Sequence, residues 1–305
     1  MSSIAIGVVV YNPKDKGRFI ESLQSLIVQN RKIYLFDNST IDSCLNIPES
    51  ITYLTEHRNC GIAYALNKIM ENAEHDGFDW VITMDQDSII PQNALNYYEK
   101  YINRNRIGII CPQVIDKRRA YMKVKEFPKE EYVKYCITSA SCTSIKAWKE
   151  IGGFDEWLFI DLVDNEFCKR LTLSNYKILK LNNLVLNQEF GKIERKSEKV
   201  VKFWLKISEI MHNINFAKFS YKKQVDPMRV YYTNRNIIYI NKKLKKYGNT
   251  GFESYNCKSY FGFQFCFNVP SILRASDKKA VLRSIIRGIS EGKKKTVEEW
   301  SVNND

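Results

Sequence analysis

Several features that mark other protein classes are missing from this chain of 305 residues. No stretch reaches the roughly 18 apolar residues that a membrane span requires. The apolar run at 4–10 has no basic residue before it and leads into Tyr11-Asn12-Pro13, so we expect no signal peptide. These absences predict a cytoplasmic protein whose contact with a membrane is at most peripheral.

Paired cysteines are also missing, because none of the eight cysteines belongs to a CxxC motif. Several lie in apolar runs, as Cys111 does in the run 109–111, and this usage favours buried, reduced thiols over a disulfide framework. The three histidines, His57, His75 and His212, are scattered along the chain, so we interpret each as an ordinary polar residue and not as a metal ligand.

Acidic residues become scarce in the last third of the chain. Residues 1–195 contain 25 Lys and Arg against 25 Asp and Glu, whereas residues 196–305 contain 22 against 9, so the last third carries the whole formal charge of +13. We therefore predict a domain at 1–195 and a distinct basic region at 196–305. A basic region beside a neutral domain suggests an anionic partner, such as phospholipid headgroups, nucleic acid or an anionic substrate.

Apolar, strand-like runs alternate with helical patterns in the first part of the chain. The pattern predicts strands at 4–10, 33–36, 51–54, 80–84 and 107–114, a further strand candidate at 135–139, and helices at 17–30, 62–73 and 164–173. This alternation is typical of an α/β protein built on a parallel sheet, in which ligands bind at the carboxyl ends of the strands.

Polar residues follow the first four predicted strands where each strand ends. They are Tyr11-Asn12, Asp37-Asn38-Ser39, Arg58-Asn59 and Asp85-Gln86-Asp87. Because carboxyl ends of parallel strands share one edge, we expect these clusters to converge. Asp85 and Asp87 are two carboxylates on a tight turn, which is suited to hold a hard divalent cation and, through it, a diphosphate. A plain turn is the alternative, because Asp is common at strand ends.

A second acidic cluster occupies 155–166, after Gly152-Gly153. Asp161 and Asp164 are three residues apart, so they share a face if a helix begins there. Acidic residues also stabilise a helix N-terminus electrostatically, which explains part of the cluster without function. The functional interpretation is a general base that takes a proton from an attacking hydroxyl group.

The ordered motifs resemble those of family 2 glycosyltransferases. They are Val-Val-Tyr-Asn-Pro at 9–13, Asp-Asn-Ser at 37–39, Asn-x-Gly-Ile-Ala-x-Ala-Leu-Asn at 59–67, Met-Asp-Gln-Asp-Ser at 84–88, and Gly-Gly-Phe-Asp-Glu at 152–156 with Phe-Ile-Asp-x-Val-Asp-x-Glu at 159–166. Within that family the chain is most similar to bacterial rhamnosyltransferases. The resemblance covers about 4–191 and implies a GT-A fold, a mixed sheet flanked by helices, followed here by a basic helical region.

The resemblance also implies roles for individual residues. Tyr11, Asn12, Asp37 and Asn59 would contact the nucleoside, Asp85 and Asp87 would bind Mg²⁺ or Mn²⁺ and the donor diphosphate, Asp164 would be the base with Asp161 as the alternative, and Glu166 and Trp157 would bind acceptor. Relatives often carry a histidine where this chain has Gln188. A glutamine can donate a hydrogen bond to phosphate but is a weaker ligand for such a metal, so metal preference is left open.

Three patterns in the basic region allow two interpretations each. Arg229 and Arg235 could bind a lipid-linked diphosphate or belong to an ordinary helix. The amphipathic pattern at 278–292 suits a helix on an anionic membrane or one packed on the protein. Phenylalanines alternate at 261–267, which suits a core strand or insertion into a membrane interface.

The function expected from these observations is inverting transfer of L-rhamnose from dTDP-β-L-rhamnose to a lipid-linked cell-surface polysaccharide intermediate at the inner face of the membrane. A UDP-linked galactofuranose, hexose or N-acetylhexosamine donor is the alternative within the fold. A nucleic-acid-binding protein is the alternative in another class, although no RNA-binding or helix-turn-helix signature accompanies the basic region. A nucleotidyltransferase is disfavoured because 11–16 lacks a glycine-rich phosphate loop.

Overall fold

The chain forms two compact units in the computed structural model, which describes residues 3–40 and 47–302. The first unit contains the described residues up to 114, those from 124 to 187, and Val302; the second contains 115–123 and 188–301. The long segments of the two units divide after Asn187, whereas the functional boundary after 195 stays a prediction. The seven cysteines within the described residues are all free, and Cys44 lies outside them.

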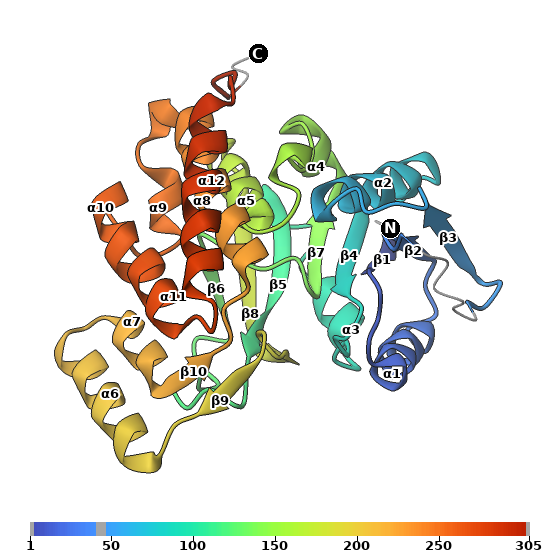
Figure 1. The fold of residues 1–305 in the computed structure, drawn as a ribbon. Helices are drawn as coiled ribbons and strands as arrows, with labels where there is room; N and C mark the ends of the chain where they lie inside the picture. Colours follow the sequence, from blue (N-terminus) through green and yellow to red (C-terminus); the bar gives the residue numbers. More distant parts are fainter. Residues whose placement is uncertain (1–2, 41–46, 303–305) are drawn as a thin grey trace. The chain divides into compact units, whose positions relative to one another are not determined.

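An eight-stranded mixed sheet forms the centre of the first unit, in the order β3-β2-β1-β4-β7-β5-β8-β6 (Figure 1). The strands are β1 (Ile4–Val10), β2 (Ile33–Asp37), β3 (Ile51–Thr55), β4 (Trp80–Asp85), β5 (Ile107–Ile115), β6 (Glu130–Val133), β7 (Ser141–Ser144) and β8 (Lys177–Asn187). β1 to β4 pair in parallel, whereas β7 runs antiparallel to both β4 and β5. The predicted mixed sheet is therefore confirmed, and the strand candidate at 135–139 is wrong: β6 ends before it and β7 begins after it.

Helices cover both faces of this sheet. They are α1 (Lys16–Ile27), α2 (Ile62–His75), α3 (Ala94–Tyr98), α4 (Ile145–Glu150) and α5 (Val163–Leu173), with a short 3-10 turn, η1 (Glu156–Leu158). Side chains alternate across a strand, so Ile6, Val8 and Val10 of β1 share a core with α1. Gly7 faces the other way, where a Cβ would lie 2.3 Å from Ile69 Cγ2 of α2. Glycine at this position lets α2 lie directly on the sheet.

The second unit is mostly helical. Its elements are β9 (Ile193–Arg195) and β10 (Tyr221–Lys223), which pair antiparallel, and the helical segments α6 (Glu198–Ile210), α7 (Ile214–Ala217), η2 (Lys218–Ser220), α8 (Pro227–Lys243), η3 (Lys245–Tyr247), α9 (Thr250–Glu253), α10 (Tyr260–Phe263), η4 (Gln264–Asn268, a π-helical turn), α11 (Val269–Arg274) and α12 (Lys278–Lys294). This composition confirms the predicted basic helical region. Within the described residues, no helix has both the length and the apolar character needed to cross a bilayer.

The two longest helices of the second unit, α8 and α12, pack closely against each other. Val281 and Ile285 of α12 are buried with Val230 of α8. Farther along α12, Gly288 and Gly292 face the α8 backbone, and a Cβ on Gly288 would lie 2.4 Å from the Tyr231 carbonyl oxygen. The amphipathic pattern at 278–292 is thus engaged largely within the protein, although part of its apolar side stays exposed.

Candidate active site

The strand ends carry the predicted polar clusters to one edge of the sheet. In the parallel register Val10 of β1 lies opposite Asp37 of β2, and Val9 lies opposite Asp85 of β4. Neighbouring strands are about 4.8 Å apart, so Asp37, Asp85 and the residues after Val10 occupy adjacent positions at this edge. Three segments distant in sequence meet here because each strand is a buried apolar run that ends at the same level.

Hydrogen bonds hold these segments against one another. The Tyr11 amide donates to Gln86 Oε1 at 2.7 Å, and the Asn12 amide donates to Ser39 Oγ at 2.8 Å. Asp37 is buried and accepts from the Tyr53 hydroxyl at 2.8 Å. Gln86 therefore bonds to the segment that follows β1. The two carboxylates of the Asp-Gln-Asp turn belong to its neighbours, Asp85 and Asp87.

A second set of contacts ties this edge to the acidic cluster. Asn38 Nδ2 donates to the Gly61 carbonyl at 3.1 Å, and the Gly61 amide donates to Asn59 Oδ1 at 3.0 Å. The next amide, that of Ile62, donates to the Phe159 carbonyl at 2.7 Å. Asn59 thus caps the turn that enters α2, and the same turn holds the segment that leads to Asp161.

That segment has an unusual backbone. Phe159, Asp161 and Leu162 have φ angles of 55°, 65° and 65°, in the left-handed region that residues with a side chain seldom occupy. Each such residue costs about 1–3 kcal/mol, and such strain gathers where the surrounding structure fixes a functional geometry. Here the strained turn ends in the first turn of α5, which carries Asp164.

Asp164 is only half-buried, yet protein surrounds its carboxyl group closely. Desolvation raises the pKa of Asp164 to about 7, because the hydrogen bond from the Asn165 amide offsets burial only in part and the charge of Asp161 adds to the rise. The structure therefore brings the two predicted base candidates together. A carboxyl group with a pKa near neutrality can accept a proton in a general-base step.

Two buried residues that sequence reasoning did not single out hold the segment at 151–154, which precedes this turn. Arg170 forms a buried ion pair with Glu166, with Nε 2.6 Å from Oε1, and donates to the carbonyls of Ile151 and Gly153. Asn67 is also buried and bonds to both the amide and the carbonyl of Phe154. In the sequence, the four-residue spacing of Glu166 and Arg170 on a predicted helix is the one pattern that indicates this ion pair. Glu166 is thus held by Arg170, while its acceptor contact, like that of the half-buried Trp157, stays a prediction.

Comparison with known proteins relates part of this site, the strand-end cluster, to a known family. Residues 5–143 match the family model described as Glycosyl transferase family 2. This match covers a little under half of the chain and supports a likeness of that region to family 2 glycosyltransferases. Over 200 residues the chain is 28% identical to the dTDP-rhamnosyl transferase RfbF of Shigella flexneri, a match that covers 58% of this chain and 65% of that protein. The chain therefore resembles bacterial rhamnosyltransferases, and the match spans a little under two thirds of this relative's length.

Solved structures of glycosyltransferases share the fold of this chain. The mannosyltransferase PcManGT from Pyrobaculum calidifontis, in complex with GDP-Man and Mn²⁺, aligns with a TM-score of 0.51 and 11% identity over 96% of this chain and 76% of its own. TarS from S. aureus aligns with a TM-score of 0.50 and 15% identity over 95% of this chain and 55% of its own. At these identities the likeness establishes the fold alone, which is the predicted GT-A fold.

The Asp-Gln-Asp turn at the end of β4 fits a divalent metal. Asp87 is exposed and Asp85 half-exposed at the end of β4, and their oxygens are the hard ligands that Mg²⁺ and Mn²⁺ accept. Within residues 3–40 and 47–302, no three His, Cys, Asp or Glu side chains gather around a common metal position. The donor set therefore suits a metal held by one or two carboxylates that takes its other ligands from substrate phosphates and water.

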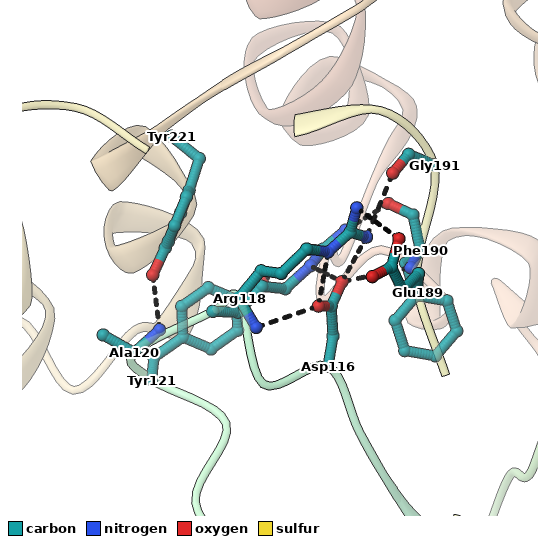
Figure 2. A network of polar contacts seen from close by, with 9 residues as sticks. Asp116, Arg118, Ala120, Tyr121, Glu189, Phe190, Gly191 and Tyr221 are labelled. Carbon is teal, nitrogen blue, oxygen red and sulfur yellow. Dashed lines mark hydrogen bonds and ion pairs between the residues drawn. The ribbon is translucent and has the colours of Figure 1, made fainter. Parts of the chain in front are cut away.

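Gln188 begins a segment of the second unit that a compact ion-pair network holds (Figure 2). Asp116 is buried, pairs with Arg118 and Arg119, and accepts from the Phe190 amide at 3.0 Å. Desolvation alone would raise the pKa of Asp116, but these hydrogen bonds outweigh it and hold the pKa well below its usual range. The network fixes the turn at 189–191, and the phosphate contact of Gln188 stays a prediction.

The two arginines predicted to bind an acceptor diphosphate lie on α8 in the second unit and differ in exposure. Arg229 is exposed, whereas Arg235 is buried with its guanidinium 4.7 Å from the centre of the Tyr232 ring and 3.6 Å from Glu291 of α12. Arg235 therefore joins α8 to α12. A role of either residue toward acceptor remains a prediction.

Proposed function

We propose that this glycosyltransferase transfers L-rhamnose, with inversion, from dTDP-β-L-rhamnose to a hydroxyl group of a lipid-linked cell-surface polysaccharide intermediate. The arrangement that carries the mechanism is Asp164 next to Asp161, in a segment joined through Phe159 and Gly61 to the strand-end cluster, where burial raises the pKa of the Asp164 carboxyl to about 7. The observation that favours the donor is the likeness to the dTDP-rhamnosyl transferase RfbF.

The residues divide the work of the reaction in this proposal. Tyr11, Asn12, Asp37 and Asn59 hold the nucleoside, and Asp85 and Asp87 bind the metal. A bound Mg²⁺ or Mn²⁺ would neutralise charge on the departing diphosphate. Asp164 takes the proton of the acceptor hydroxyl, and Asp161 keeps that carboxyl poised through its own charge. Residues 1–195 are the catalytic part, and 196–305 serve acceptor binding and peripheral membrane contact at the inner face of the cell membrane.

A donor screen tests the proposed substrate. Purified protein with Mg²⁺ or Mn²⁺ is incubated with dTDP-rhamnose and with UDP-linked galactofuranose, hexoses and N-acetylhexosamines, and both hydrolysis and thermal stabilisation are followed. We expect dTDP-rhamnose to give the largest effects, which chelation removes. A response confined to a UDP-sugar replaces the donor and keeps the mechanism, and no response to any nucleotide sugar overturns the proposal.

Two substitutions separate the proposed roles. Asp164→Asn should lower transfer by about 10²- to 10⁴-fold, the usual contribution of a general base, while the stabilisation by donor and metal persists. Asp87→Ala should instead remove the metal-dependent part of that stabilisation. Full transfer activity in Asp164→Asn would refute the base assignment, and the Asp161→Asn variant would then test the alternative.

A further inference from the structure

An exposed apolar row runs along the continuous helical segment α10–η4–α11 of the second unit. Its members, four residues apart, are Phe261, Phe265, Val269 and Leu273, with 71%, 58%, 41% and 69% of their surface exposed. The rings of Phe261 and Phe265 lie 4.9 Å apart, edge to face. Single exposed apolar residues are ordinary, but a contiguous row of large ones marks an interaction surface. We call these four residues the apolar row.

The opposite side of the same segment is anchored, so the apolar row has a fixed orientation. Phe263 is fully buried and stacks on Phe267 with ring centres 5.2 Å apart. Asn268 is buried and exchanges hydrogen bonds of 2.9 and 2.8 Å with Asn234 of α8. The alternating phenylalanines of the sequence are therefore split by a helix: one pair packs inside the unit and the other faces outward.

Positive charge gathers at the C-terminal end of the apolar row. Arg274 follows Leu273 directly, and its guanidinium lies 4.8 Å from the centre of the Phe219 ring. The neighbour of Phe219 is Lys218, whose pKa is lowered first by desolvation and then by the charges of Arg119 and Arg274. In the part of the chain that the structure describes, no carboxylate forms an ion pair with Lys218 or Arg274. Neighbouring cations without a carboxylate partner favour an external anion.

Lys218 donates to Asn215 Oδ1 at 2.8 Å, so its partner is a neutral amide. Aromatic side chains beside cations that lack a carboxylate partner match the boundary between the acyl chains and the phosphates of a bilayer. The surplus of 13 positive charges in residues 196–305 adds long-range attraction to an anionic surface. The amphipathic helix α12 is the competing surface, but its Val281 and Ile285 are buried in the unit, and only Leu282 and Ile286 face outward among the apolar residues of that pattern, at 47% and 60% exposure.

We propose that the apolar row docks the second unit on an anionic lipid bilayer, with its side chains at the headgroup–acyl boundary and Arg274 and Lys218 at lipid phosphates. The inference deepens the proposed function, on which it rests, by assigning the membrane contact to α10–η4–α11 and not to α12. The full chain would then meet the membrane through a surface that is already formed before binding.

Co-sedimentation of the full chain with vesicles tests this assignment. Vesicles of phosphatidylcholine with one third phosphatidylglycerol are compared with pure phosphatidylcholine, and Phe261→Ser/Phe265→Ser is compared with the matched α12 variant Leu282→Ser/Ile286→Ser. We expect the first variant to bind anionic vesicles about 10- to 100-fold more weakly, as the loss of two inserted aromatic side chains predicts, and the α12 variant to change binding less than about threefold. Circular dichroism melting confirms that both variants are folded.

The charge contribution has its own variant. Lys218→Gln/Arg274→Gln should weaken binding to the anionic vesicles by about 10- to 30-fold, because each cation near an anionic surface contributes roughly a factor of five, and should leave the weak binding to pure phosphatidylcholine unchanged. Equal losses in the α10–η4–α11 and α12 variants, or no binding of the full chain to either vesicle, would overturn the assignment.

Two further measurements distinguish the remaining outcomes. Binding of a single-stranded oligonucleotide that depends on Phe261 and Phe265, without vesicle binding, would assign the apolar row to nucleic acid and refute docking on lipid. Hydrolysis of dTDP-rhamnose without vesicles should be unchanged in the Phe261→Ser/Phe265→Ser variant. Hydrolysis that persists while vesicle binding fails refutes the docking alone, whereas vesicle binding without response to any nucleotide sugar refutes the proposed function alone.

Discussion

Asp164 combines partial exposure with a pKa of about 7, a pairing that makes its protonation measurable in two ways. As a general base it must be ionised, so we expect kcat/KM for transfer to rise with pH from about 5.5 and to level off above about 7.5. A pH profile with saturating metal measures this. An ascending limb that is absent from the wild-type chain over this interval would contradict the role.

The same carboxyl group should also affect stability, but here the free energy of unfolding falls as pH rises. Because the folded-state pKa lies above the unfolded value near 3.8, the folded chain binds the extra proton between these values. The contribution of Asp164 to the free energy of unfolding is therefore complete below about pH 4 and is lost as pH rises through 7. Asp164→Asn should flatten that part of the dependence of urea unfolding on pH, and an unchanged curve would show that the carboxyl titrates normally.

Arg170 tests how much its buried ion pair with Glu166 and its bonds to the 151–153 backbone stabilise the fold. Arg170→Met removes one partner of a buried pair, so we expect the free energy of unfolding to fall by about 3–5 kcal/mol in urea titrations. Lys149→Met is the control, because Lys149 pairs with Glu74 at the surface and should contribute less than about 1 kcal/mol. Similar losses in both variants would mean that Arg170 has no special structural role.

Residues at the site were predictable to different degrees for a physical reason. Asp85 and Asp87 lie at the end of a strand and Asp164 lies in the first turn of a helix, and the apolar pattern predicts both elements, so their neighbourhood followed from sequence. Asn67 and Arg170 act through contacts with backbone groups more than fifteen residues away, and no local pattern encodes such partners. Asp116 was missed for the same reason, since its partner Phe190 is 74 residues distant.

At the scale of elements, continuous apolar runs made β1, β2, β3 and β4 predictable, while short polar strands were not. β7 reads Ser-Cys-Thr-Ser and is fully buried between β4 and β5, so its strand character comes from its neighbours and not from its own sequence. The phenylalanines at 261–267 suggested a strand because they alternate. The helix α10 and the π-helical turn at 264–268 cover this run, and the interpretation as a strand is wrong.

The close contact between α8 and α12 predicts that a side chain at Gly288 destabilises the second unit. Alanine in place of glycine normally stabilises a helix by about 0.5–1 kcal/mol, but a Cβ at Gly288 would lie 2.4 Å from the Tyr231 carbonyl oxygen. We therefore expect Gly288→Ala to lower the free energy of unfolding by about 1–3 kcal/mol. Ser290→Ala, at an exposed position of the same helix, should change it by less than about 0.5 kcal/mol. Stabilisation by Gly288→Ala would refute the close packing.

At the scale of the whole molecule, the two structural units are not separated by a single boundary in the sequence, whereas the change in charge after residue 195 suggests one. Ile115, the last residue of β5, and residues 116–123, which lie between β5 and β6 in sequence, belong to the second unit. The Asp116 network explains this membership, because Arg119 donates to the Phe190 carbonyl, Arg118 to the Gly191 carbonyl, and the Ala120 amide to the Tyr221 hydroxyl (Figure 2). A single domain boundary inferred from composition could not assign the separate segment 115–123 to the second unit.

In a chain that ends at Asn187, the segment 115–123 should therefore be more accessible to proteases. Without 188–301, Asp116 loses the Phe190 amide and both arginines lose their carbonyl partners, so we expect trypsin to cleave after Lys117, Arg118 or Arg119 at least about tenfold faster than in the full chain. Cleavage after Lys68, in the middle of α2, serves as the internal control and should change little, because α2 packs within the first unit. Equal protection of 117–119 in both chains would mean that the first unit alone orders this segment, and faster cleavage at both places would mean that the shortened chain has lost its fold.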